Sequence, residues 1–149
     1  GENARKIPTA KELYEMRTPY VGNNAAVGSV LDALPIGGLT RGEVQLQTEQ
    51  EPYVLGVTYT SADGENLDRG MVQEMFLKNA ALMFCLVDNL GVVTATIETS
   101  SAEGQGFIAN REELQRQLGV DFTQIGSSLE DFQAFYRQVK AAALSEDNG

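Results

Sequence analysis

The stretch Ala80-Ala81-Leu82-Met83-Phe84-Cys85-Leu86-Val87 is uninterrupted apolar sequence, and it decides how the chain folds. It lies in a longer segment, from Asp68 to Leu90, that predicts a helix, with Asp68 as the N-cap and Gly91 as the left-handed residue that closes it. The first half of this segment is apolar on one side, whereas the second half is apolar nearly all round. Because such a helix has to be covered on several sides, we expect it at the centre of the molecule.

Strand-like patterns lie on both sides of the predicted helix. In residues 43–49 and 53–59 apolar side chains alternate with others, and the turn between the two runs predicts an antiparallel hairpin. Residues 92–99 predict a third strand, and residues 105–109 a short fourth one. These elements do not form an alternating βαβα series. The sequence therefore predicts an α+β fold, in which a small antiparallel sheet of three to four strands packs on the long central helix.

Additional helices are predicted before the first strand. Thr9 and Glu12 have the spacing of a capping box, which predicts a short helix directly after them. Asn23 or Asn24 is expected to cap a second helix, which Pro35 ends.

The C-terminal part of the chain also predicts helices. Asn110 is expected to cap a short helix that ends at Gly119, and Ser127 or Ser128 to begin a final one.

The length of 149 residues is enough for one hydrophobic core without disulfides. No linker rich in Pro, Gly or Ser divides the chain. Residues 1–8 are polar and lack periodicity, so we expect them to be a flexible tether. Residues 9–149 are expected to form a single domain.

The composition excludes several classes of function. Eleven basic residues against 21 acidic ones give a net charge of −10, which disfavours binding to nucleic acid or to an anionic membrane surface. The chain has no His, so Ser-His-Asp, Cys-His and His-ligated metal sites cannot be built from it alone. Its single cysteine, Cys85, lies in the apolar run and is interpreted as a buried hydrophobic residue.

Two short motifs resemble ligand-binding loops. Gly104–Ala109 has the letters of a dinucleotide-binding loop, but that loop has to open a helix directly, and the next predicted helix begins only after it. Asp63–Asp68 offers oxygen ligands, but it has Leu67 and Asp68 where a calcium loop needs an oxygen ligand and a glycine. We interpret the two motifs as a flexible loop and a solvated turn. The sequence thus predicts no catalytic residue, no cofactor and no metal.

Four residues are candidates for contact with a partner. Tyr20, Asn23 and Asn24 belong to a predicted loop between the first two helices, and loops often carry binding residues. Arg41 is one of few cations between the second helix and the hairpin. We favour structural roles for all four. Tyr20, Asn23 and Asn24 would then form a rigid connection between two helices, and Arg41 would hold neighbouring elements together.

Polar residues of the central helix are expected to have structural roles. Asn79 precedes the fully apolar part of the helix, so its amide is expected to be buried and to need hydrogen-bond partners. The side chain of Asp88 or Asn89 is expected to tie the end of the helix to a turn.

Several stretches, in this order, resemble an uncharacterised bacterial domain family. They are Leu13-Tyr14, Arg17-Thr18-Pro19-Tyr20-Val21-Gly22-Asn23-Asn24, Val27 to Pro35, Leu46-Gln47-Thr48, Glu51-Pro52-Tyr53, Phe76 to Phe84 and Leu86 to Leu90. The resemblance covers residues 12–99 and leaves residues 100–149 as a C-terminal helical extension. Members of this family are similar to secreted lipoproteins of Gram-positive bacteria and to the outer portions of membrane proteins akin to antirepressor metallopeptidases. No catalytic residue is implied.

The resemblance implies an extracytoplasmic, membrane-anchored lipoprotein. Residues 1–8 are then the remainder of a tether whose lipid-bearing part is absent from this chain. That lipid tether is the one expected contact with the membrane. The first hypothesis for function is a non-catalytic module that binds an envelope protein or a small-molecule ligand, as a sensor does.

Two alternatives stay open. One is an enzyme that uses carboxylates or a Ser/Lys pair, for example Ser29 or Ser61 with Lys78, and it requires those groups about 3 Å apart in a cleft. The other is a structural assembly module, which would bury an apolar patch in a homo-oligomer.

Overall fold

The structure is a computed structural model and describes residues 7–61, 67–99 and 105–144. The helices are α1 (Ala10–Tyr14), α2 (Asn24–Ala33), α3 (Arg69–Leu86), α4 (Arg111–Leu118), α5 (Phe122–Ile125) and α6 (Leu129–Ala141). The strands are β1 (Thr40–Gln47), β2 (Tyr53–Thr60), β3 (Leu90–Glu98) and β4 (Gln105–Asn110).

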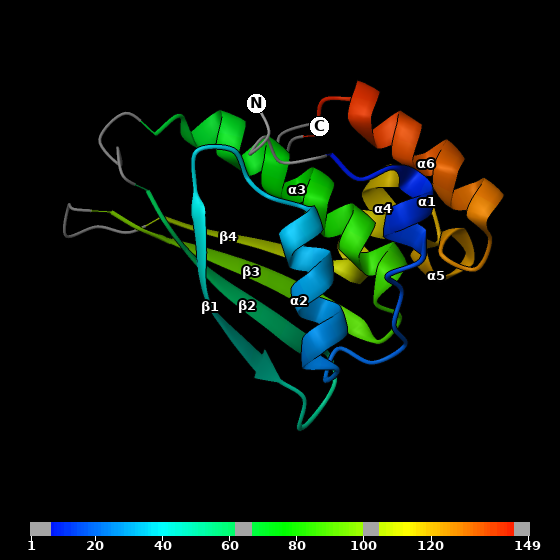
Figure 1. Cartoon of the computed structure of the whole chain (residues 1–149), viewed down its shortest axis with the longest axis horizontal. Helices are drawn as coiled ribbons and strands as arrows, with labels where there is room; N and C mark the ends of the chain where they lie inside the picture. Colours follow the sequence, from blue (N-terminus) through cyan, green and yellow to red (C-terminus); the bar gives the residue numbers. More distant parts are fainter. Residues whose placement is uncertain (1–6, 62–66, 100–104, 145–149) are drawn as a thin grey trace.

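The four strands form one sheet in the order β1-β2-β3-β4 (Figure 1). The predicted α+β fold, with a four-stranded sheet on a long helix, is confirmed. The predicted antiparallel pairing is confirmed for β1 with β2 and for β3 with β4.

The antiparallel prediction is wrong for the central pair, because β2 and β3 run parallel. Helix α3 lies between these two strands in the chain and has 18 residues, a length of roughly 27 Å. This is close to the length of an eight-residue strand, roughly 26 Å. The helix therefore returns the chain to the end of the sheet where β2 begins, and β3 has to run in the same direction.

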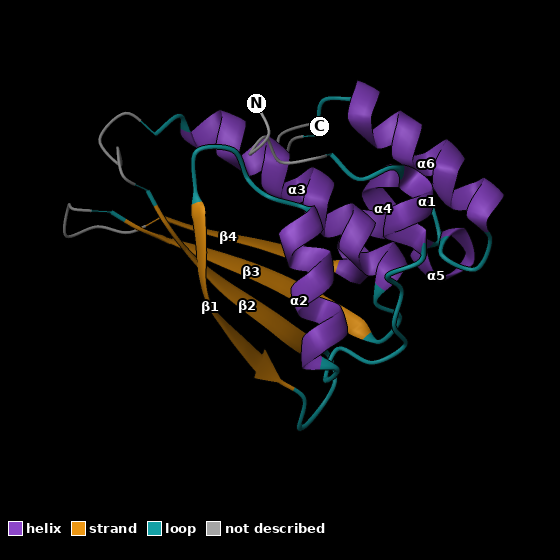
Figure 2. Ribbon diagram, viewed as in Figure 1, coloured by secondary structure: helices purple, strands orange, loops and turns teal. Residues whose placement is uncertain are grey.

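The helices α2 and α3 lie on one side of the sheet, while α1, α4, α5 and α6 gather around the C-terminal part of α3 (Figures 1 and 2). Side chains on the helix side of the strands are buried, among them Leu55, Val57, Val93 and Ile97. On the opposite side Ile108 is 59% exposed. The sheet therefore has one covered and one open face.

The central helix is enclosed as predicted, because every residue from Ala80 to Leu86 is buried. Its Phe84 ring stacks on Phe122 of α5 at 5.5 Å between ring centroids. Phe122 in turn meets Phe135 of α6 edge-on. The C-terminal helices thus share one core with the central helix.

The predicted helix caps are confirmed. Thr9 and Glu12 form the capping box of α1, and the side chains of Asn23, Asp68 and Asn110 cap α2, α3 and α4. Ser128 caps α6, and the left-handed Gly119 ends α4. The short helix α5, which Asp121 caps, was not predicted.

The end of α3 differs from the prediction. The helix ends at Leu86, and Gly91 lies inside β3 without a left-handed backbone. The loop before α2 accounts for this, because the Thr18 amide donates to the Leu86 carbonyl and the Thr18 carbonyl accepts from the Asp88 amide. The loop before α2 thus forms hydrogen bonds with backbone groups that would be paired within α3 if the helix were longer. None of the helices in the described ranges has the length and hydrophobicity needed to cross a membrane.

Candidate functional site

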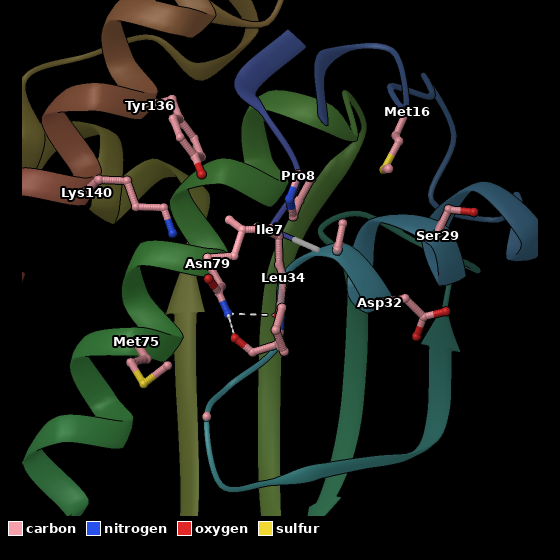
Figure 3. A pocket seen from close by; sticks show the side chains of 13 residues that line it. Ile7, Pro8, Met16, Ser29, Asp32, Leu34, Met75, Asn79, Tyr136 and Lys140 are labelled. Carbon is pink, nitrogen blue, oxygen red and sulfur yellow. Dashed lines mark hydrogen bonds between the residues drawn. The ribbon is translucent and has the colours of Figure 1, made fainter. Parts of the chain in front are cut away.

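A pocket of about 690 Å³ opens between the end of α2, the middle of α3 and the last turns of α6 (Figure 3). Its lining residues are Ile7, Pro8, Met16, Ser29, Asp32, Ala33, Leu34, Pro35, Gly37, Met75, Asn79, Tyr136 and Lys140. Most of these side chains are apolar, with a few polar groups among them. Pockets that hold small molecules have this size and this kind of lining.

The wall formed by α2 and α3 is held together by Asn79. This residue is 9% exposed, and its side-chain amide donates to the carbonyl oxygens of Leu34, at 2.9 Å, and Pro35, at 3.1 Å. These carbonyls follow the last turn of α2, where a helix leaves its carbonyls without partners. The prediction that the Asn79 amide is buried and needs partners is confirmed.

The opposite wall is formed by Tyr136 and Lys140, one turn apart on α6. The ammonium group of Lys140 lies 5.3 Å from the centroid of the Tyr136 ring, a cation–π contact. Figure 3 shows the Tyr136 hydroxyl and the Lys140 ammonium extending from α6 toward the side of the pocket where Asn79 lies. A tyrosine hydroxyl is protonated at neutral pH, and burial raises the pKa of the Tyr136 hydroxyl further, so this group can donate a hydrogen bond.

The charges of the lining are separated. Asp32 lies on the far side of the pocket from Lys140 (Figure 3). One oxygen of its carboxylate accepts hydrogen bonds from Nη2 and Nε of Arg41, at 2.6 and 3.1 Å. No carboxylate among the described residues lies within ion-pair distance of Lys140.

The four residues predicted as interaction candidates do not line this pocket. Arg41 connects α2 to β1 through Asp32, and Asn23 caps α2 through the Ala26 amide. Tyr20 is 65% exposed, and Asn24 begins α2 at an exposed position. Their contact with a partner stays a prediction.

The loop that carries Tyr20 is joined firmly to the end of α3. The Val21 amide donates to Oδ1 of Asn89 at 2.6 Å, and the Asn89 amide donates to the Pro19 carbonyl at 3.2 Å. The expected tie between the helix end and a turn is therefore made by Asn89.

Ser29 and Lys78, one pair of the predicted Ser/Lys alternative, each have another partner in the structure. The Ser29 hydroxyl donates to the Ala25 carbonyl at 3.1 Å, and the Lys78 ammonium lies 3.7 Å from Glu74. Ser61 directly follows β2.

The described residues contain no group of three or more acidic or cysteine side chains that could hold a metal ion. Of the predicted calcium-like turn, residues 63–66 lie outside the described residues, as does Gly104 of the dinucleotide-like motif. The remainder of that motif is strand β4, which is followed directly by α4.

A family model described as a domain of unknown function, DUF4825, matches residues 13–109. The chain belongs to the DUF4825 family. No curated protein and no solved structure matches it. At its C-terminal side the match extends beyond the residues 12–99 of the predicted resemblance and includes β4 up to Ala109.

Some of the residues that line the pocket lie inside the DUF4825 match, and others lie outside it. Met16, Leu34, Met75 and Asn79 lie within the matched range. Ile7 and Pro8 precede it, and Tyr136 and Lys140 follow it. In this DUF4825 protein most of the apolar wall thus belongs to the family domain, whereas the positive charge of the lining, Lys140, lies on a helix outside the match.

Sequence analysis missed the role of Tyr136 and Lys140. Tyr136 fits the apolar face of α6, and Lys140 is an ordinary lysine near a helix C-terminus. Their position opposite Asn79 depends on contacts between segments far apart in the chain, which periodicity and spacing do not reveal.

Proposed function

We propose that this DUF4825 protein is a non-catalytic binding module, and that its binding site is the pocket between α2, α3 and α6. The observation that carries the proposal is the size of the pocket, about 690 Å³, combined with a mainly apolar lining. A few polar groups in an apolar cavity fix the orientation of a small molecule and provide specificity.

Binding of an uncharged fluorescent probe tests the proposal. N-phenyl-1-naphthylamine, which brightens in apolar surroundings, is titrated into the full chain. We expect saturable binding of one molecule per chain. Absence of saturation would contradict a preformed apolar site.

A matched pair of variants locates the bound probe. Ala33→Phe places a ring in the lining of the pocket, whereas Ala25→Phe makes the same change on the same helix at an exposed position outside it. We expect Ala33→Phe to weaken probe binding about tenfold or more and Ala25→Phe to leave it unchanged. Circular dichroism shows whether both variants fold. Equal binding by a folded Ala33→Phe variant would place the site elsewhere.

The cellular location is part of the same proposal. We propose that the module works outside the cytoplasm as part of an anchored lipoprotein, which is supported by the resemblance of its sequence to such proteins. Labelling of growing cells with an alkyne fatty acid, followed by capture of the full-length gene product, tests the anchor. Protease added to intact cells tests exposure, and a product protected from it would contradict the proposed location.

A further inference from the structure

We propose that the pocket binds an amphiphile with a single carboxylate head and an aliphatic body, and that Lys140 supplies the matching positive charge. This inference rests on the proposed function, because it specifies which class of small molecule the pocket takes.

The balance of charge in the lining favours an anion. Among the described residues, two charged side chains line the pocket, Asp32 and Lys140. The Asp32 carboxylate is already paired with Arg41, at 2.6 Å, whereas Lys140 has no carboxylate partner among the described residues. Within the part of the chain that the structure describes, the pocket thus presents one positive charge without an acidic partner, in a chain whose net charge is −10. Such a cation is available for an anionic group from outside.

The polar groups on the α6 side suit a carboxylate head. The Lys140 ammonium and the Tyr136 hydroxyl are both donors and extend into the same side of the pocket (Figure 3). A carboxylate accepts hydrogen bonds at both of its oxygens, so it can use the two donors together. A phosphate monoester would bring close to two negative charges, which this single cation does not match.

The remaining lining suits an aliphatic body. Leu34 and Pro35 form an apolar surface, and the flexible side chains of Met16 and Met75 adapt to different shapes. Ile7 lines the same pocket and is 76% exposed, although a side chain of this size is usually covered. An aliphatic chain in the pocket would cover part of this exposed apolar surface.

Displacement of the naphthylamine probe by three ten-carbon compounds tests the inference. Decanoate, decanol and decyl phosphate are titrated into the probe-bound full chain at pH 7.5, below their aggregation concentrations. We expect decanoate to bind about fivefold more tightly than decanol, which is the contribution of one partly exposed ion pair.

Two variants that each remove one positive charge from α6 identify the cation. Lys140 lines the pocket, whereas Arg137 lies on the same helix, is exposed and does not line it. We expect Lys140→Gln to abolish the preference for decanoate while the affinity for decanol stays unchanged. Arg137→Gln is expected to retain the full preference, which rules out an effect of net charge alone.

The outcomes distinguish this inference from the proposed function. If the probe binds and decanoate and decanol displace it equally well, the pocket is a binding site and the charge assignment is wrong. The same conclusion follows if Lys140→Gln retains the preference. Tighter binding of decyl phosphate than of decanoate would overturn the choice of a carboxylate. If neither the probe nor decanoate binds, as measured by calorimetry, the proposed function itself fails.

Discussion

Gly126 lies where the turn after α5 comes closest to the end of α3. A Cβ atom built on it would overlap the carbonyl oxygen of Cys85 and lie 3.0 Å from the carbonyl carbon. The contact is between two backbones, so no flexible side chain can move away. The Gly126 carbonyl also accepts a hydrogen bond from Arg17 at 3.1 Å, which fixes the turn on its other side. Only a residue without a side chain fits between these constraints.

We expect Gly126→Ala to lower the free energy of unfolding by about 3 kcal/mol, because the turn and α3 have to move apart. Gly22→Ala is the matched control, since a Cβ atom there meets no atom within 4 Å. Urea denaturation of both variants measures the difference. A Gly126→Ala variant as stable as Gly22→Ala would show that the two backbones separate at little cost.

Single residues were the most predictable part of this molecule. A capping side chain bonds to a backbone amide three residues later, so Thr9, Asp68 and Asn110 are recognised from their immediate neighbours. The prediction for Gly91 was wrong because the deciding contact is not local. Thr18, far away in the sequence, bonds to Leu86, the last residue of α3, and to Asp88 just after it.

At the scale of elements, the pattern of side chains predicted which segments are strands but not how all of them pair. Alternation shows which face of a strand is buried, and it is the same whether the neighbouring strand runs parallel or antiparallel. The register of Leu55 opposite Val93 and of Val57 opposite Ala95 is set by the path of α3 across the sheet. That path depends on β2, α3 and β3 together, so it does not follow from the pattern of any one of them.

Helix α6 packs against α1 through Phe132. This side chain is fully buried, and its ring lies 6.0 Å from the Tyr14 ring of α1 and 6.4 Å from the ring of Tyr136, one turn later in α6 itself. We expect Phe132→Ala to lower the free energy of unfolding by about 3–5 kcal/mol, because it leaves a cavity between α1 and α6.

Tyr20→Ala removes an aromatic side chain that is 65% exposed and serves as the control, with an expected loss of about 0.5 kcal/mol or less. Denaturation curves of both variants compare the two losses. Equal losses would show that α6 is not anchored by its buried aromatic face.

At the scale of the whole molecule, burial of weakly acidic groups sets the response to alkali. Burial raises the pKa of the Cys85 thiol and of the Tyr59 hydroxyl, and nearby Arg111 and Arg41 lower these values only in part. The folded state therefore holds protons that the unfolded state releases. The stabilisation is fully present below the unfolded pKa values, about 8.5 for Cys and 10 for Tyr. It is lost as pH rises toward the folded values.

We therefore expect the free energy of unfolding to fall above about pH 9, by up to about 1.4 kcal/mol per pH unit for each such group. Cys85→Ala and Tyr59→Phe should each flatten this dependence, whatever their effect at pH 7. Tyr20→Phe removes a hydroxyl at an exposed position and is the matched control. Urea denaturation between pH 7 and 11 gives the slopes. A slope unchanged by both buried-site variants would contradict the assignment.

The pocket is a property of the whole molecule, which is why it could not be predicted from the sequence. Its walls come from residues as far apart as Met16, Asn79 and Lys140, and each of these residues also fits an ordinary structural role. The approach of α6 to α3 depends on the packing of aromatic rings, in which Phe135 of α6 meets Phe122 of α5 and Phe122 stacks on Phe84 of α3. Such packing is known only when the whole chain is folded.

Ile7 and Pro8 reach the pocket from the beginning of the described chain, and Tyr136 and Lys140 reach it from near the end. A molecule bound in the pocket would contact both of these distant segments at once. Hydrogen exchange should therefore slow in the two segments together when the pocket is occupied.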